Sequence, residues 1–228
     1  MPFCAQYFPS HKVYKHDYSD IQTGFRLGLP IIKNKLFWFT NEEITRRNEP
    51  LFYKAGDKGG VIDEATANQI SSFLKSNYGF DAGAFGDYSI YSQSTKFFNR
   101  LDWNISDKHQ LSIRNSYVNS EASNLERDAA NFRFGSMDFK QHNQTNSTVA
   151  ELKSHFGSAS NSLILGYSDI RDYRTPSSSN FAFPQVEIAA NGGTIFLGNE
   201  REATVFNMKQ KTFEFTNNIT WFKGDHTF

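Results

Sequence analysis

The stretch TKFFNRLDWNISDKHQLSIRNSYV, residues 95–118, is the part of the sequence that decides the fold. Its side chains alternate between apolar and polar in two runs, which the turn-forming segment 106–108 separates. Successive side chains of a strand point to opposite faces, so the pattern predicts a β-hairpin with one apolar and one strongly polar face. Each arm is about 11 residues long. That length exceeds the ~5–6 residues usual in globular sheets and matches the ~9–11 that a tilted strand needs to cross a bilayer.

The apolar face of this hairpin continues in the later strands and is the face we expect to point outward, toward lipid. It comprises Phe97, Leu101, Trp103, Leu111, Ile113, Tyr117, Leu163, Leu165, Phe213, Phe215, Ile219 and Trp221. None of these residues is Lys or Arg, each of which costs ~2–4 kcal/mol on the lipid face at the bilayer midplane. Three polar residues interrupt the face, Asn99, Asn115 and Asn217, and we expect them near a membrane interface.

The composition favours a membrane β-barrel over a soluble enzyme. Aromatic residues make up 16% of the 228 residues, with 23 Phe and 10 Tyr, and the mean hydropathy is −0.57. A barrel needs aromatic girdles outside, polar residues inside and hydrophilic loops. The 24 basic and 24 acidic residues balance, which gives no reason to expect nucleic acid as a partner. The single cysteine, Cys4, excludes an internal disulfide framework, and no apolar run is long enough for a transmembrane helix.

Extending the alternation along the chain predicts about eight strands, the last of them only begun. They are expected at 22–29, 35–45, 95–105, 110–119, 146–156, 162–171, 211–222 and 227–228. Residues 1–20 show no clean period and are expected to be irregular. Residues 21–228 therefore form the candidate barrel segment.

Short and long connections alternate between these strands. The short ones lie near 30–35, 106–109, 157–161 and 223–226, and the long ones cover roughly 47–94, 119–144 and 172–210. Outer-membrane barrels have short periplasmic turns and long extracellular loops. The predicted fold class is therefore all-β: an antiparallel up-and-down transmembrane β-barrel segment, about eight strands of a larger barrel, with long extracellular loops.

Two of the long connections contain local structure of their own. In the first, Asp63 is a candidate N-cap for a helix through Tyr78, and Gly79 is a plausible C-terminal stop. Its expected apolar stripe is formed by Ile70, Phe73, Leu74 and Asn77. In the third, the segment 183–198 predicts a small hairpin that turns around residues 191–193.

No catalytic, cofactor-binding or metal-binding residue is assigned, and the substrate-binding residues are unknown. Glu42 and Glu43 are adjacent on a strand, so their side chains point to opposite faces and do not form a facing acid/base pair. His11 and His16 lack the further ligands that a metal site needs. The glycine-rich segment 79–89 lacks the Lys-Ser/Thr of a phosphate-binding loop. The chain is not expected to be an enzyme.

Several phrases, in order, resemble the β-barrel of TonB-dependent outer-membrane receptors, specifically the Oar-like branch. They are GFRLGLPIIKNKLFWFTNEEITRR (24–47), YGFDAG (78–83), KFFNRLDWNISDKHQLSIRNSYV (96–118), the loop segment FPQVEI to GGTIFLG (183–198), and FTNNITWFKGDHTF (215–228). In that branch a segment GGPIIKNKLFFF marks an early barrel hairpin. This chain has Leu29 where the second glycine is usual.

The resemblance implies a protein of the cell outer membrane that binds an unknown solute at extracellular loops and imports it with energy from the inner membrane. Its partners would be outer-membrane lipid and the TonB system. The plug and the TonB-contacting segment of such receptors are not recognisable in the 228 residues. We therefore expect an internal fragment of a barrel of about 22 strands, which is not transport-competent alone.

Two alternatives from other classes remain. One is an outer-membrane surface protein for adhesion or structure that uses the barrel only to display its loops. The other is a soluble carbohydrate-binding β module, for which Trp103 and Trp221 are surface-capable aromatics. An upstream plug and TonB-contacting segment would argue against the first, and partitioning between water and detergent separates the second.

Overall fold

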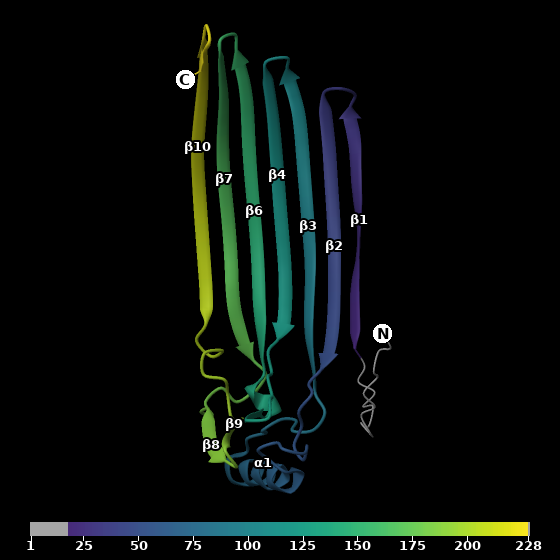
Figure 1. Cartoon of the computed structure of the whole chain (residues 1–228), viewed down its shortest axis with the longest axis vertical. Coiled ribbons are helices and arrows are strands. Elements are labelled where there is room, and N and C mark those ends of the chain that lie inside the picture. Colours follow the sequence, from purple (N-terminus) through teal and green to yellow (C-terminus); the bar gives the residue numbers. More distant parts are fainter. Residues whose placement is uncertain (1–17, 228) are drawn as a thin grey trace, which may run out of the picture.

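The computed structural model describes residues 18–227 and consists mainly of one long antiparallel sheet, with a small subdomain at one end (Figure 1). The order of its strands in space is β1-β2-β3-β4-β6-β7-β10-β11. Their bounds are β1 Ser19–Ile32, β2 Leu36–Pro50, β3 Ser89–Ser106, β4 His109–Ser123, β6 Phe139–Phe156, β7 Ala159–Pro176, β10 Asn207–Lys223 and β11 His226–Thr227. Each large strand pairs with the next in the chain, so the all-β, up-and-down antiparallel arrangement is confirmed.

The register of the sheet confirms the predicted hairpin. In β3 and β4, Leu101 pairs with Ile113 and Trp103 pairs with Leu111, so these apolar side chains share one face. All four tight turns lie at one end of the sheet, and all three long connections lie at the other (Figure 1). The alternation of short and long connections therefore separates the two ends of the molecule.

The large strands extend further toward the long connections than the sequence predicts. β3 begins at Ser89 rather than near 95, and β6 begins at Phe139 rather than near 146. Most side chains on both faces of these extensions are polar, so the alternation that reveals a strand is lost although backbone pairing continues. Side chains link the strands there: the Tyr91 hydroxyl donates a hydrogen bond to Glu121, and His142 stacks on Tyr173 with ring centroids 4.5 Å apart.

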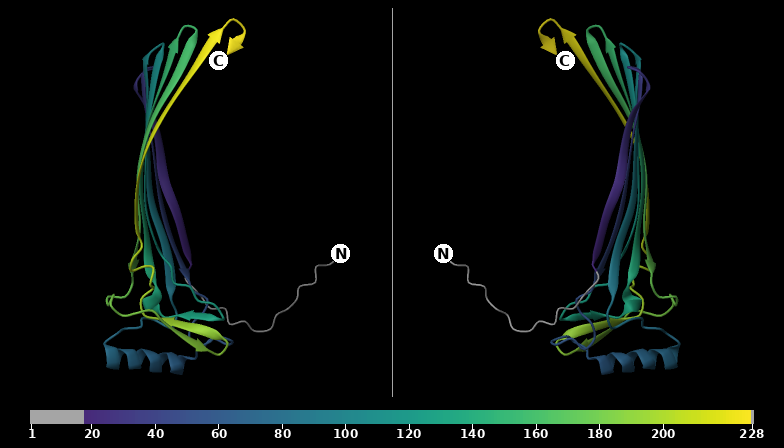
Figure 2. Two further views of the ribbon diagram at one scale, coloured as in Figure 1. Left: turned by 90° about the vertical axis from the view of Figure 1, so that its left-hand side faces the viewer. Right: turned by 90° about the vertical axis from the view of Figure 1, so that its right-hand side faces the viewer.

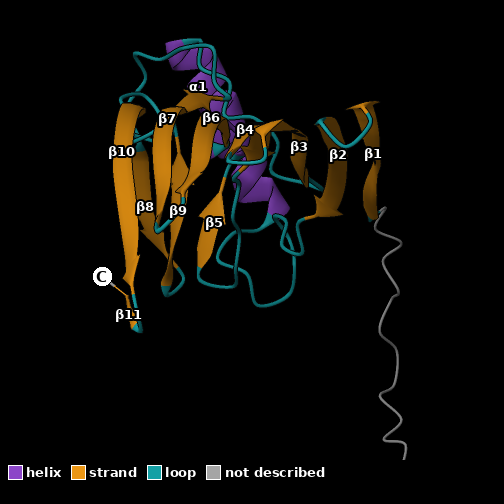
Figure 3. Cartoon of the chain, turned by 90° about the horizontal axis from the view of Figure 1, so that it is seen from above, coloured by secondary structure: helices purple, strands orange, loops and turns teal. Residues whose placement is uncertain are grey.

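The sheet is a single open layer. Seen along the strands, it runs from β1 to β10 without its two ends meeting (Figure 3). Edge-on it is one strand thick, with the subdomain projecting to one side at the loop end (Figure 2). Among residues 18–227, no strand pairs with the outer edge of β1, and β11 covers only the last two residues of β10. Within the same range, no helix has the length and hydrophobicity to cross a membrane.

The three long connections, residues 51–88, 124–138 and 177–206, fold together into what we call the loop subdomain. It contains helix α1 (Glu64–Tyr78), the 3₁₀ turn η1 (Gly135–Met137), and a three-stranded sheet of order β5-β9-β8. The strands are β5 Asn131–Arg133, β8 Val186–Ala190 and β9 Gly193–Leu197; β5 runs parallel to β9 and β8 runs antiparallel to it. The short helix and the small hairpin expected from the sequence are both confirmed.

Helix α1 has the ends that the sequence predicts. The Asp63 carboxylate accepts a 2.7 Å hydrogen bond from the backbone N–H of Thr66, and Gly79 ends the helix in the left-handed region at φ 64°. The predicted stripe is only partly correct. Ala67 and Leu74 are buried, whereas Phe73 is 56% exposed. Phe73 instead forms the wall of a hollow described below.

The buried hydrophobic core lies in the loop subdomain and not in the large sheet. Every fully buried hydrophobic side chain of residues 18–227 belongs to the subdomain: Ala55, Val61, Ile62, Ala67, Leu74, Phe80, Ala82, Leu125, Phe132, Phe134, Met137, Ile195, Leu197 and Ala203. Within residues 18–227, the apolar face of the large sheet therefore has no buried hydrophobic core packed on it.

Residues 1–17 lie outside the described part of the chain, and with them most of the stretch 1–20, Cys4, His11 and His16. Ser19 and Asp20 belong to β1. The predicted final strand at 227–228 overlaps β11, which comprises His226 and Thr227; Phe228 lies outside the described residues.

Candidate functional site

The apolar face of the sheet, which we call the outer face, forms continuous rows across the strands. One row runs through Leu29, Trp38, Leu101, Ile113, Ala150, Leu165 and Phe215, which are successive register partners from β1 to β10. The side chains are most exposed at the two ends of the row, with Leu29 at 45% and Phe215 at 66%. A soluble protein rarely leaves so extended an apolar surface in water.

Aromatic residues border these aliphatic rows at both ends. On the side of the long connections lie Phe25, Phe97, Tyr117, Tyr167 and Phe213, and on the side of the tight turns lie Trp103, His109, Phe156 and Trp221. At ~3.3 Å per residue, the two borders are about 20 Å apart along β3 and about 26 Å apart along β10. These separations are of the order of the ~25 Å apolar band of outer-membrane barrels, which is flanked by aromatic girdles.

The three Asn residues that interrupt the outer face, Asn99, Asn115 and Asn217, lie close to these borders, and two of them make hydrogen bonds within the sheet. Asn115 donates hydrogen bonds to Asn146 at 2.8 Å and to Thr148 at 2.9 Å, one row from Tyr117. Asn217 accepts a hydrogen bond of 2.5 Å from Asn161, in the row that contains Trp103. These hydrogen bonds satisfy part of the polar capacity of Asn115 and Asn217 within the sheet.

Most of the charged side chains between the two aromatic borders lie on the opposite face of the sheet. Lys96 pairs with Glu43 at 2.6 Å and Arg100 with Asp102 at 2.9 Å, and both pairs are partly exposed. Glu42, Asp169 and Lys211 lie on the outer face, in the register row that contains Phe97 and Tyr117. The sequence inference that Glu42 and Glu43 point to opposite faces is confirmed by the register.

Arg127 joins the long connections to one another. The four hydrogen bonds of its guanidinium to the described chain all go to main-chain carbonyl oxygens: those of Tyr53, Ala84 and Gly86 in the first connection and of Arg133 in the second. The guanidinium carbon also lies 4.7 Å from the ring centroid of Phe132. Burial lowers the pKa of Arg127 to about 10, so the group still carries its charge at neutral pH.

A second joint ties the first connection to the start of β6. The Tyr88 hydroxyl donates a 2.7 Å hydrogen bond to the carboxylate of Asp138, whose other oxygen accepts from the backbone N–H of Asn124 at 2.8 Å. Burial, and then this hydrogen bond, raise the pKa of the Tyr88 hydroxyl. Asp138 is only 3% exposed, so these hydrogen bonds are buried inside the fold.

The glycine-rich segment 79–89 has a packing role. Gly83 has φ 74°, and a Cβ placed there would lie 2.6 Å from the backbone nitrogen of Ser136. The two segments bond directly, with the Gly135 N–H donating to the Ala84 carbonyl at 2.8 Å. Gly83 therefore allows the two main chains to approach closely, which explains this glycine without a phosphate.

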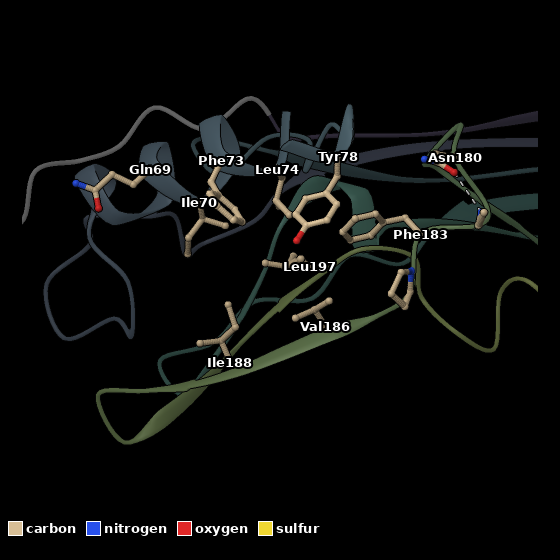
Figure 4. Close-up of a pocket in the computed structure, with 12 residues that line it drawn as sticks. Gln69, Ile70, Phe73, Leu74, Tyr78, Asn180, Phe183, Val186, Ile188 and Leu197 are labelled. Atoms are coloured by element: carbon tan, nitrogen blue, oxygen red, sulfur yellow. Dashed lines mark hydrogen bonds between the residues drawn. The ribbon is translucent and has the colours of Figure 1, made fainter. Parts of the chain in front are cut away.

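A hollow of about 750 Å³ opens between α1 and the β8–β9 hairpin (Figure 4). We call it the loop pocket. It is lined by Gln69, Ile70, Phe73, Leu74, Tyr78, Asn180, Ala182, Phe183, Pro184, Val186, Ile188 and Leu197. Its walls come from the first and third connections. The sequence predicts both as extracellular loops, but it does not predict that they pack against each other.

Sequence reasoning missed β5, the parallel pairing of β5 with β9, and the loop pocket. The segment 124–138 reads as a polar connection, yet Phe132 and Phe134 enter the core from it. Their spacing of two is the strand signal that was available. Within residues 18–227, no group of three or more His, Cys, Asp or Glu side chains is placed to hold a metal ion.

The fold and the candidate surfaces define a β-rich protein with one large open antiparallel sheet and a folded loop subdomain. No protein-family model, curated protein or solved structure matches this chain.

Proposed function

We propose that this chain is part of the β-barrel of a TonB-dependent outer-membrane receptor, which binds a solute at its extracellular loops and imports it with energy from the inner membrane. The observation that carries the proposal is the outer face: aliphatic rows between two aromatic borders, on a sheet that has no core of its own. In water these side chains would remain exposed, with Phe213 at 72% and Ile219 at 66%. In a bilayer they contact lipid, and their burial becomes favourable at roughly 25 cal/mol per Å².

The division between the two ends of the sheet supports the orientation. Tight turns at one end and a folded loop subdomain at the other follow the plan of periplasmic turns and extracellular loops. The outer-face borders lie between these two ends, so the loop subdomain stands clear of the apolar band. In this proposal it is the part of the receptor that meets the solute.

The open edges support a larger barrel. An unpaired strand edge in hydrocarbon leaves backbone groups unsatisfied, at a cost of several kcal/mol each. β1 presents such an edge along Ser19–Ile32, and β10 presents one along most of Asn207–Lys223. Further strands that pair with these edges would close the wall. The plug and the TonB-contacting segment belong to such further parts, and no catalysis is proposed.

The proposal is tested in two measurements on cells that carry the complete gene. Fractionation should find the product in the outer membrane, and it should be extracted by detergent and not by high salt. Uptake of labelled solutes from spent growth medium should require both the gene and TonB. A product that stays in the aqueous fraction would refute the membrane assignment, and gene-dependent uptake that persists without TonB would refute the energy coupling. Outer-membrane location with no gene-dependent uptake would favour the surface adhesion alternative.

A further inference from the structure

We propose that the loop pocket is the binding site for a neutral, mainly apolar small solute with an aromatic or branched aliphatic body. This inference rests on the proposed function, because it names the class of solute that such a receptor would take at its loops. The pocket volume of about 750 Å³ lies within the ~300–1,000 Å³ of small-molecule sites. Its position in the loop subdomain places it away from the apolar band of the sheet.

The floor of the loop pocket is preformed. Leu74 is 6% exposed and Leu197 is 2% exposed, so both belong to the subdomain core. Phe183 stacks on Phe80 with ring centroids 3.9 Å apart, and Phe80 is itself buried. Asn199 fixes the segment in front of it by donating 2.6 Å hydrogen bonds to the carbonyl oxygens of Asn180 and Phe183. A ligand would therefore meet walls that need little ordering, which favours binding.

The rim of the loop pocket, by contrast, is apolar and uncovered. Phe73 and Tyr78 from α1 are 56% and 60% exposed, and Ile188 from β8 is 37% exposed. The rings form a chain of edge-to-face contacts, with centroids 5.9 Å apart for Phe73 and Tyr78 and 6.0 Å apart for Tyr78 and Phe183. An inserted apolar group would bury these side chains, which now face each other across the hollow (Figure 4).

The lack of charged side chains in the lining of the loop pocket determines which class of ligand it can bind. None of its lining residues carries a formal charge, so an ionic group placed inside would lose its hydration without a partner. The polar side chains of the lining are Gln69, Asn180, whose Oδ1 already accepts a hydrogen bond from the backbone N–H of Ala182, and Tyr78, whose hydroxyl points into the hollow (Figure 4). They suit one or two hydrogen bonds to an uncharged polar substituent, with the body of the solute against the rings.

A neutral aryl diazirine, 3-phenyl-3-(trifluoromethyl)diazirine, tests the site in outer membranes that contain the complete gene product. After photolysis, mass spectrometry locates the label. We expect label on the peptides 64–78 and 180–197, and we expect excess biphenyl to compete it away. The same probe dissolves in lipid, so label on 97–117 and 213–221 reports contact of the outer face with the bilayer. The two readouts separate failure of the pocket proposal from failure of the membrane proposal.

Three variants make the result specific. Ile188→Trp should fill the hollow, and Phe73→Asp should put a charge in its wall, so each should lower pocket labelling by about tenfold or more, the ratio that ~1.4 kcal/mol produces. Val205→Trp is the matched control, because Val205 is in the same subdomain, is 79% exposed and does not line the pocket. Phe73 and Ile188 are both partly exposed, so these substitutions should leave the fold intact.

Pocket label that biphenyl removes, and that both pocket variants lose while the control retains it, supports the proposal. Label spread evenly over the subdomain, or unchanged in both variants, overturns it. A separate reaction with a bifunctional amine- or carboxyl-directed cross-linker tests for a second copy in the hollow: pairs of chains joined through 64–78 or 180–197 would also overturn the proposal.

Discussion

The Nη1 atom of Arg127 donates a 2.7 Å hydrogen bond to the carbonyl oxygen of Gly86, and so links two connections that are separated by two strands of the sheet. The Nη2 atom of the same guanidinium donates to the carbonyl oxygen of Ala84 at 2.7 Å. A buried cation whose partners are main-chain carbonyls fixes the path of the backbone, because each acceptor it leaves would be unsatisfied.

Replacing Arg127 by Lys should loosen the loop subdomain while leaving the sheet intact. A single ammonium on a flexible stem cannot reach the four carbonyls that the guanidinium fork serves. We expect the local free energy of opening to fall by about 2–4 kcal/mol. Hydrogen exchange at the backbone N–H of Gly135 and of Thr194, which bond across connections, measures it. Arg201→Lys is the control, since Arg201 is exposed; equal effects in both variants would contradict the role of Arg127.

Gly83→Ala should destabilise the loop subdomain through a collision of main chains. The added Cβ would lie 2.6 Å from the backbone nitrogen of Ser136, and no flexible side chain can move to relieve it. Gly59→Ala is a matched control: Gly59 has a similar positive φ, 83°, but nothing lies within 4 Å of its Cβ position. The difference between the two isolates the contact from backbone strain, which is common to both.

We expect that difference to be about 2 kcal/mol or more, in the range of overpacked core substitutions. Rates of limited proteolysis within residues 51–88 provide the measurement. Equal rates in the two variants would mean that the glycine-rich segment is not held against η1 as described.

The acid sensitivity of helix α1 follows from its N-cap. The hydrogen bonds from the backbone and then the side chain of Thr66 lower the pKa of Asp63 below its usual 3.8. A lowered carboxyl pKa means that this stabilisation is complete above the usual pKa and is lost as the pH falls through the folded value. We therefore expect α1 to lose protection from hydrogen exchange below about pH 4, and to keep it between pH 5 and 8.

The variant Asp63→Asn distinguishes the effect of protonating the Asp63 carboxylate from the effect of losing the N-cap hydrogen bond. Asn is as good an N-cap as Asp but carries no proton-dependent charge. The variant should retain its helix at neutral pH and lose the acid-dependent part of the change. If Asp63→Asn and the unchanged chain respond to acid identically, Asp63 is not the titrating group. Asp128, whose pKa is lowered first by its hydrogen bond from Asn131, would then be the next carboxylate to replace.

How much of the molecule can be predicted from the sequence depends on which interactions are local. The strand that contains Leu101 and the cap at Asp63 are readable because period and capping are properties of neighbouring residues. The strand extension at Ser89 is not readable, because polar side chains on both faces remove the period while pairing is decided by the partner strand. The same holds for the loop pocket, whose walls at Phe73 and Ile188 come from connections far apart in the chain.

The outer face gives the sharpest test of the membrane assignment. Ile113 belongs to the outer face, in the row of Leu101 and Leu165, and its neighbour Ser112 belongs to the opposite face. Ile113→Arg should cost ~2–4 kcal/mol if the row lies near the bilayer midplane, because a guanidinium would have to enter hydrocarbon. Ser112→Arg changes the charge of the same strand equally but adds it to a face that already carries Arg100 and Arg114.

We expect the amount of folded, protease-resistant product in the outer membrane to drop sharply for Ile113→Arg and to remain near normal for Ser112→Arg. In a soluble β module the arginine of Ile113→Arg would project into water, because Ile113 is 37% exposed in the open sheet, and neither variant would change the yield. The side of the sheet that rejects the charge is therefore the side that faces lipid. A loss of folded product for Ser112→Arg alone would mean that the opposite face contacts lipid. An unchanged amount for both variants would contradict the proposal that the sheet lies in a bilayer.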